Sequence, residues 1–150
     1  EKFLGYKGFM GFEYTSTIAP GLILGVEKEN SFIKQILDSY QGERFHYDKH
    51  GIYKTINTRI TEALLEIGLK KNNKYQIVGD FHIFPSEYFC GYNTDIREPE
   101  ITENTICWHH YLGSWSNPSL KTKTQDVLKK VIGVDKYKKL LYFVREKRRK

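Results

Sequence analysis

The amino-acid sequence predicts an α/β fold that ends in helices. Short apolar runs alternate with segments whose apolar residues recur every three or four positions, which is the pattern of strands alternating with helices. Hydrophobic residues make up 39% of the chain and aromatic residues 15%, which is too much apolar surface for a disordered protein. A chain of 150 residues is the size of one domain.

The first part of the chain predicts a strand followed by a helix. Residues 9–13 begin an apolar stretch, and residues 21–26 are expected to form a buried strand. Ser31 is expected to cap a helix that ends near Gly42. The polar and aromatic residues 43–54 that follow are expected to form a loop.

The middle of the chain predicts a second helix and a pair of strands. This helix is expected to stop at Gly68, and its apolar face comprises Ile60, Ala63, Leu64 and Ile67. Asn72 and Asn73 predict a turn. Residues 75–79 and 81–84 predict two short strands, or one bulged strand, before Pro85 ends them.

The last part of the chain predicts a loop, a strand and two helices. Residues 86–103 are expected to form a long irregular loop, and residues 105–109 a last strand. A helix is then expected from near Thr124 to Gly133. A second helix is expected to place four residues on one apolar face, namely Tyr137, Leu140, Leu141 and Val144.

Charge is distributed unevenly along the chain. The net charge is +6, but residues 121–150 contain twelve basic and three acidic side chains, so the tail carries +9 and residues 1–120 carry −3. This division predicts a nearly neutral globular body, residues 1–120, and a basic amphipathic helical tail, residues 121–150. Two roles for the tail remain open, namely a surface helix that covers the body and attachment to an anionic membrane surface. We expect no nucleic-acid partner, because the tail's aromatic residues match no recognisable RNA- or DNA-binding module.

Other features narrow the class of protein. The longest apolar stretch, residues 19–26, is well short of the ~20 residues that a membrane-spanning helix needs. Cys90 and Cys107 are expected to be buried free thiols in a reducing cytoplasm, since no second ligand pair completes a zinc site with Cys107 and His110. No signal peptide is recognised, and the start at Glu1 predicts a segment of a longer protein.

Polar groups gather at the end of the last predicted strand. His109 and His110 stand there, and a Gly-Ser turn leads to Trp115. An imidazole can ligate a divalent cation, the Ser114 hydroxyl can bind that cation or a phosphate, and the Trp115 indole N–H can donate to a phosphate oxygen. Strand ends of open α/β sheets are where such ligands bind. Paired histidines also occur as structural side chains, so the residues alone leave both roles open.

Five motifs follow one another along the body of the chain: Gly-Phe-Glu (11–13), Gly-Val-Glu-Lys (25–28), Phe-Pro-Ser-Glu-Tyr-Phe (84–89), Thr-Glu-Asn-Thr (102–105) and His-His-Tyr-Leu-Gly-Ser-Trp (109–115). Together this series, over about residues 8 to 118, resembles glycosyltransferase family 32. These are sugar transferases with an Asp-x-Asp motif, and they include bacterial capsular polysaccharide synthesis proteins. The resemblance implies the C-terminal part of a GT-A fold, a UDP- or GDP-sugar donor, and a bound Mn²⁺ or Mg²⁺.

The resemblance also implies roles for individual residues by their motif position. His109 is the first choice as metal ligand and His110 the second. Ser114 and Trp115 are assigned to the donor diphosphate. The metal would bridge the two phosphates and stabilise the charge on the leaving nucleoside diphosphate.

The sugar-binding residues are assigned in the same way. Family members place donor-sugar or acceptor contacts just before the second helix, at the positions of Asn57, Thr58 and Arg59, so Asn57 and Thr58 are implied as such contacts. Glu13 is implied at the sugar site, with a capping or salt-bridge role as the alternative. No catalytic residue is assigned. The motif residues Glu87, Tyr88 and Tyr92 are interpreted as packing the loop rather than binding the acceptor.

One departure from the family is large, because none of the six aspartates forms an Asp-x-Asp pair. In the family this motif precedes the segment that matches residues 11–13, so we expect it upstream of this chain and expect the isolated chain to be inactive. The expected activity is retaining, metal-dependent transfer of a sugar to a polysaccharide or glycolipid acceptor in capsule or cell-surface polysaccharide synthesis. The expected location is the cytoplasmic face of the inner membrane. The alternative is a non-catalytic or degenerate transferase-like, membrane-associated binding module.

Overall fold

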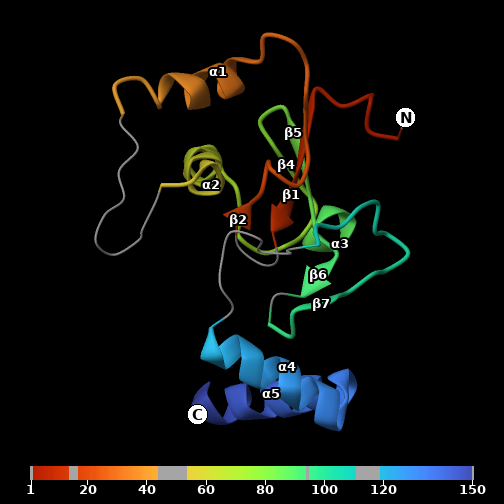
Figure 1. The fold of residues 1–150 in the computed structure, drawn as a ribbon. Helices are drawn as coiled ribbons and strands as arrows, with labels where there is room; N and C mark the ends of the chain where they lie inside the picture. The colour runs from red at the N-terminus through yellow and green to blue at the C-terminus, as the bar shows by residue number, and fades with distance from the viewer. Residues whose placement is uncertain (1, 14–16, 44–53, 94, 111–118, 150) are drawn as a thin grey trace. The chain divides into compact units, whose positions relative to one another are not determined.

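The computed structural model describes residues 2–13, 17–43, 54–93, 95–110 and 119–149 (Figure 1). The chain packs as two compact units. The first unit comprises Glu1–Tyr92 and Pro99–His109, and the second comprises Asn93–Glu98 and His110–Lys150. The first unit contains a mixed sheet with helices, and the second contains two C-terminal helices, so the mixed α/β class predicted from the sequence is confirmed.

The sheet of the first unit is built around β1 (Gly8–Glu13), whose apolar residues begin where the sequence predicts. On one side β1 pairs in parallel with β5 (Phe81–Phe84), and β5 pairs antiparallel with β4 (Gln76–Val78). On its other side β1 pairs antiparallel with β2 (Thr17–Ile18) and β3 (Leu24–Val26). β1 is therefore the central strand.

One face of this sheet carries the hydrophobic core. Alternate residues of a strand point to the same face, so Met10 and Phe12 of β1 lie beside Phe81 and Ile83 of β5. The helices α1 (Ser31–Asp38) and α2 (Ile56–Glu66) pack on this face, on the same side of the sheet in Figure 1. The buried members of the core are Met10, Phe12, Ile18, Ile36, Ile60, Leu64, Leu69, Val78, Phe81 and Ile83.

The opposite face of the sheet is aromatic. Phe84 of β5 packs edge-on against Phe89 with ring centroids 5.6 Å apart, and Phe3 stacks on Phe9 at 5.1 Å. Phe89 ends the short helix α3 (Ser86–Phe89) and lies so close to β1 that a Cβ on Gly11 would come within 2.8 Å of its ring. Only glycine therefore fits at this position of β1 without a shift of the aromatic ring.

Local capping sets the helix boundaries. Asn30, not Ser31, caps α1, since its side chain accepts from the Ile33 N–H at 3.1 Å. The helix ends at Asp38 rather than near Gly42, because the hydroxyl of Ser39 turns back to donate to the Ile36 carbonyl at 2.7 Å. The second helix stops where predicted, at Gly68, which adopts a φ of +105° that favours glycine.

Two predicted strands need correction. The strand expected at residues 21–26 is shorter, because only Leu24–Val26 pair with β1, and Leu24 is 40% exposed. Residues 105–109 are not a strand: the Ile106 N–H donates to the Tyr88 carbonyl of α3 at 2.8 Å, so this segment follows α3 and joins no sheet.

The segment expected as one irregular loop, residues 86–103, is also more ordered than predicted. It contains α3 and two short strands, β6 (Tyr92–Asn93) and β7 (Glu98–Pro99), which pair with each other. The two strands further upstream, β4 and β5, are separate, as one of the two sequence alternatives predicts. The loop expected at 43–54 lies outside the described residues except at its two ends.

The second unit contains α4 (Leu120–Ile132) and α5 (Val134–Arg149), which pack together. Ser119 caps α4 by accepting from the Thr122 N–H at 3.2 Å, so the helix begins before Thr124. Gly133 ends it with a φ of +83°, as predicted. Among the described helices, none is long and apolar enough to cross a bilayer.

Lys129 connects α4 to the 93–98 segment within the second unit. Its side chain is 9% exposed, and its Nζ donates to the Ile96 carbonyl at 3.0 Å and to Glu98 Oε1 at 2.7 Å. Burial alone would lower the pKa of Lys129, but hydrogen bonds and charges from Glu98 and Asp126 outweigh burial and raise this pKa. Burial also acts to raise the pKa of Asp126, whereas Lys129 and Arg97 lower it below its usual value.

These shifts predict how the stability of the second unit depends on pH. A lowered carboxyl pKa stabilises the fold above its unfolded value of about 3.9, and this contribution is lost as the pH falls through the folded pKa. A raised lysine pKa stabilises the fold at pH values below the unfolded pKa of about 10.4, and this contribution is lost as the pH rises through the folded pKa. We expect Asp126→Asn to flatten the acid limb of helix melting followed by circular dichroism, whereas the exposed-site control Glu146→Gln leaves it unchanged. Equal acid limbs in wild type and Asp126→Asn would contradict this.

Candidate functional site

Glu13 and Asn57, both assigned to sugar contacts by motif position, are brought together in the first unit. Glu13 is the last residue of β1, and Asn57 lies in the first turn of α2. The Asn57 side-chain amide donates to Glu13 Oε2 at 3.1 Å, and both residues are half-buried. The contact joins positions 44 residues apart. It places a carboxylate at the carboxyl end of the central strand, where open α/β sheets bind their ligands.

A threonine of α2 holds Asn57 in this position. The Thr61 hydroxyl donates to the Asn57 carbonyl at 2.6 Å and accepts from the Ile18 N–H of β2 at 2.9 Å. Because Thr61 is 3% exposed, this bridge is shielded from water and ties the start of α2 to the edge of the sheet. The Glu13–Asn57 pair is therefore a preformed feature of the fold.

Thr58 lies next to this pair but takes part in capping α2. Its backbone N–H donates to the Thr55 hydroxyl at 3.3 Å, and the two hydroxyls lie 3.2 Å apart. Residues 57 and 58 lie inside α2, whereas the sequence places them just before the helix. This is because Thr55 is the cap, with its side chain accepting from Thr58.

Arg59 stands beside Asn57 and Thr58, at the positions where the resemblance places sugar or acceptor contacts, and it is a buried polar residue in the structure. It is 7% exposed, and its guanidinium donates to the Ser39 carbonyl at 3.1 Å, pairs with Glu43, and lies 4.1 Å from the centre of the Tyr40 ring. Its Nε has no hydrogen-bond partner among the described residues. Arg59 thus holds the end of α1 against α2, two residues after Asn57 in the sequence.

The predicted metal ligands lie at the surface. His109 and His110 are both exposed and follow the irregular segment that runs along α3. His109 packs with the first unit and His110 with the second. Ser114 and Trp115, assigned to the donor diphosphate, lie outside the described residues.

The described residues do not fit a divalent metal ion by themselves. Within residues 2–13, 17–43, 54–93, 95–110 and 119–149, no three His, Cys, Asp or Glu side chains converge to form such a site. Cys90 and Cys107 are both free thiols, the first buried and the second half-buried. Burial raises the pKa of Cys107, which favours the neutral thiol over the metal-binding thiolate.

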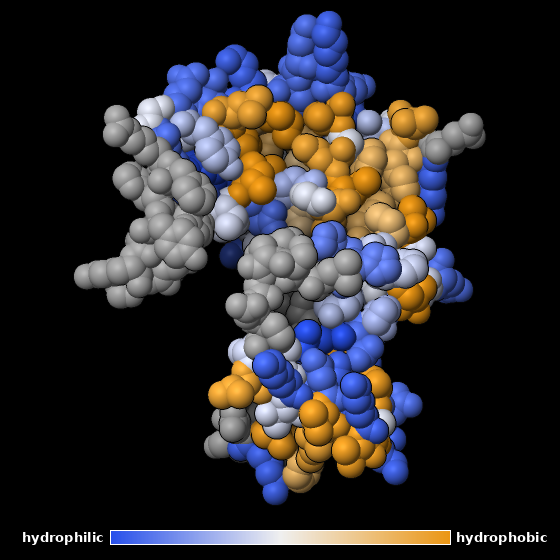
Figure 2. All heavy atoms as spheres, in the orientation of Figure 1, coloured by the Kyte–Doolittle hydropathy of each residue, from blue (hydrophilic) through white to orange (hydrophobic). Residues whose placement is uncertain are grey.

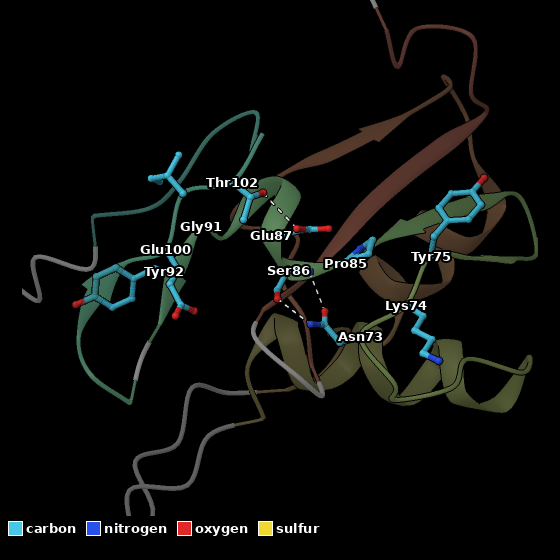
Figure 3. Close-up of a pocket in the computed structure, with 11 residues that line it drawn as sticks. Asn73, Lys74, Tyr75, Pro85, Ser86, Glu87, Gly91, Tyr92, Glu100 and Thr102 are labelled. Carbon is cyan, nitrogen blue, oxygen red and sulfur yellow. Dashed lines mark hydrogen bonds between the residues drawn. The ribbon is translucent and has the colours of Figure 1, made fainter. Parts of the chain in front are cut away.

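A cleft of about 710 Å³ opens on the first unit beside α3. Four segments line it: the turn before β4, the start of α3, the start of β6, and the irregular segment that leads into the Thr-Glu-Asn-Thr motif. Figure 3 shows Tyr75 at one end, Tyr92 and Glu100 at the other, and Ser86 and Glu87 between them. The lining residues are Asn73, Lys74, Tyr75, Pro85, Ser86, Glu87, Gly91, Tyr92, Glu100, Ile101 and Thr102.

This cleft brings together two of the motifs that the sequence series contains. Glu87 of the Phe-Pro-Ser-Glu-Tyr-Phe motif accepts from the Thr102 hydroxyl at 3.2 Å and from the Asn104 amide at 3.3 Å. The sequence interpretation of Glu87 as a packing residue is therefore incomplete, because its carboxylate lines an open cleft as well as ordering a loop. Only the three-dimensional structure reveals this, since the partners lie fifteen and seventeen residues away.

A comparison of this chain with protein-family models, curated proteins and solved structures finds no match.

Proposed function

We propose that the chain is the C-terminal part of a GT-A-fold glycosyltransferase that moves a sugar from a UDP- or GDP-sugar to a polysaccharide or glycolipid acceptor. The observation that supports this most directly is the Glu13–Asn57 hydrogen bond of 3.1 Å at the carboxyl end of the central strand. The resemblance assigns both residues to sugar contacts without reference to their position in space, Glu13 through its motif and Asn57 through its place at the start of the second helix. Their meeting at the end of a strand is what a shared sugar-binding role requires.

The chemistry of this pair suits recognition of a sugar hydroxyl. A carboxylate accepts strong, charge-assisted hydrogen bonds from hydroxyl groups. The Asn57 amide orients the carboxylate, and the buried Thr61 bridge holds Asn57. A fixed acceptor of this kind distinguishes a ligand that presents a hydroxyl from one that does not.

The proposal keeps the cofactor and donor contacts that the resemblance implies. Mn²⁺ or Mg²⁺ would take an imidazole ligand from His109 or His110, and Ser114 and Trp115 would contact the donor diphosphate. The proposal takes the carboxylate ligands from the Asp-x-Asp motif of the family, which this sequence lacks.

The proposal also includes a peripheral position on the cytoplasmic face of an anionic membrane, through the second unit. Several apolar side chains of α4 and α5 are exposed, among them Val131 at 75% and Phe143 at 55%. Figure 2 shows hydrophobic side chains interspersed with hydrophilic ones on the surface of these helices. An apolar surface within a tail of net charge +9 supports shallow membrane binding over a helix that only covers the body. The same feature would serve a non-catalytic membrane-associated module, which is the alternative function.

A substitution at Glu13 tests the transferase proposal. In the complete protein, supplied with Mn²⁺ and a panel of UDP- and GDP-sugars, Glu13→Gln should lower kcat/KM by about 10- to 100-fold, the effect of losing a charge-assisted hydrogen bond. Glu62→Gln is the matched control, because Glu62 lies on α2, the helix of Asn57, in an exposed pair with Lys54. The measurement is the rate of sugar release from the donor, which is quantified by chromatography.

The outcomes separate the two functions. No turnover of any UDP- or GDP-sugar by the wild-type complete protein, with either Mn²⁺ or Mg²⁺, would overturn the transferase proposal and favour the binding module. Turnover with equal kcat/KM in wild type and Glu13→Gln would leave a transferase but remove Glu13 from its sugar site.

A further inference from the structure

The cleft beside α3 has walls that are held in place without a ligand. Asn73, in a left-handed conformation at φ +52°, accepts from the Ser86 N–H at 2.8 Å and donates to the Ser86 hydroxyl at 3.0 Å. The next residue, Glu87, binds the other wall through Thr102 and Asn104. Two consecutive residues of α3 therefore hold opposite sides of the cleft, so a ligand would not have to order it on binding.

The charges of the cleft disfavour a phosphate-bearing ligand. Its lining contains one lysine, Lys74, against two glutamates, Glu87 and Glu100. A nucleoside diphosphate would meet net negative charge here, with the carboxylate of Glu87 at the centre of the cleft (Figure 3). The cleft is thus unsuited to the donor and suited to a neutral or cationic ligand.

The remaining lining groups suit a ligand with many hydroxyls. Amide, hydroxyl and carboxylate groups make up a little less than half of the exposed lining, and apolar atoms, including those of the tyrosine rings, make up the rest. Tyr75 lies at one end with 50% of its surface exposed, and its ring is fixed because it packs 5.3 Å from Phe84 and its hydroxyl contacts His82 Nδ1 at 2.6 Å. A sugar ring has hydroxyl edges and C–H faces, so hydrogen-bonding groups beside a fixed aromatic ring match both. The volume of about 710 Å³ lies within the usual range for ligand sites.

We propose that this cleft binds a neutral glycan through the Glu87 carboxylate and the Tyr75 ring, and that this glycan is the acceptor of the transferase. The glycan-binding role stands on the cleft itself, whereas the acceptor role rests on the proposed function. Glu87 accepts hydrogen bonds from sugar hydroxyls while Thr102 and Asn104 hold it. The Tyr75 ring supports a C–H face at the end of the cleft.

Saturation-transfer NMR with the 150-residue chain tests the binding step. The probes are lactose, maltose, cellobiose and N,N′-diacetylchitobiose. We expect transfer to at least one disaccharide, and binding about tenfold weaker in Glu87→Gln and in Tyr75→Ala, since each loses one principal contact. Glu87→Gln retains the shape of the side chain, so it keeps the test valid if Tyr75→Ala fails to fold. Glu103→Gln is the matched control, because Glu103 is exposed and does not line the cleft.

Three outcomes would overturn the glycan assignment. They are no transfer to any of the four disaccharides from a folded chain, equal binding by wild type and both variants, and displacement of the sugar by UDP or inorganic phosphate.

In the complete protein, Tyr75→Ala should raise the acceptor KM about tenfold. Donor turnover without glycan binding would overturn only the proposed glycan-binding role of the cleft. Glycan binding without donor turnover would overturn only the proposed transferase activity.

Discussion

Replacing Phe12 by alanine should lower the free energy of unfolding of the first unit by about 3–5 kcal/mol. Phe12 is fully buried on the central strand and stands opposite Ile18 in the sheet register. Its ring belongs to the core between the sheet and the helices α1 and α2, so its removal leaves a cavity there. A typical domain is stable by only about 5–15 kcal/mol, so this loss is a large part of the total.

Hydrogen exchange of the amides of β1 and β5 measures this effect, because these strands exchange through the opening of the core. Ile77→Ala is the control, since Ile77 belongs to the same sheet but is 61% exposed and should change stability by less than about 0.5 kcal/mol. Equal losses of protection in the two variants would mean that Phe12 is not a central core residue. The Glu13–Asn57 pair depends on the same strand, so a loosened core should also disturb that site.

Local patterns were sufficient to predict the parts of the fold whose boundaries local chemistry sets. The second helix stops at Gly68 because the chain there needs a positive φ, and β5 ends because Pro85 cannot continue the ladder. Gly133 separates α4 from α5 for the same reason as Gly68. Each of these signals lies within one or two residues of the boundary that it predicts.

The predicted strand at 105–109 failed because strand formation depends on a distant partner. The residues Thr105 to His109 have suitable β propensity, but the Ile106 N–H donates to the Tyr88 carbonyl, eighteen residues away, instead of pairing with a strand edge. The strand expected at 21–26 is shortened for a related reason, since β1 also has to pair with β2 along that edge. Sequence periodicity contains no information on which of two partners takes an edge.

In the candidate site, the sequence identified some of the residues, whereas only the structure shows which of them are in contact. Motif position named Glu13 and Asn57, but their contact across 44 residues is visible only in the structure. The cleft could not be predicted, because Asn73, Glu87 and Thr102 come from three segments and each is an ordinary loop residue by itself. The burial of Arg59 could not be predicted, because a charged residue in a helix is normally exposed and this burial follows from long-range contacts with Ser39 and Glu43.

Neutralising four lysines of the second unit should weaken its binding to anionic vesicles by up to roughly a thousandfold at low salt. Each lysine near an anionic surface contributes about 1 kcal/mol, so four contribute about 4 kcal/mol. The lysines chosen are exposed on α4 and α5, and glutamine retains helix propensity, so the helices should persist. The positions to replace with glutamine are Lys130, Lys136, Lys139 and Lys147.

The control removes the same charge from the first unit instead. Glutamine at four exposed lysines there leaves the total charge equal to that of the test variant, so any difference in vesicle binding reports position and not net charge. The control positions are Lys28, Lys54, Lys70 and Lys71. Sedimentation with phosphatidylcholine–phosphatidylglycerol vesicles, compared with pure phosphatidylcholine vesicles, is the measurement.

Salt and a second variant separate the electrostatic part of this binding from the apolar part. Screening lengths fall to about 10 Å at about 0.1 M salt, so the lysine contribution should shrink as salt is added. The contribution of the exposed Val131 and Phe143 side chains should persist, and Phe143→Ser should remove part of it at any salt concentration. Equal binding of the two lysine variants to anionic vesicles would show that the basic tail is not a membrane anchor. The alternative role of the tail, as a surface helix that covers the body, would then be favoured. A protein partner would be the better candidate than a lipid for the exposed apolar residues of α4 and α5.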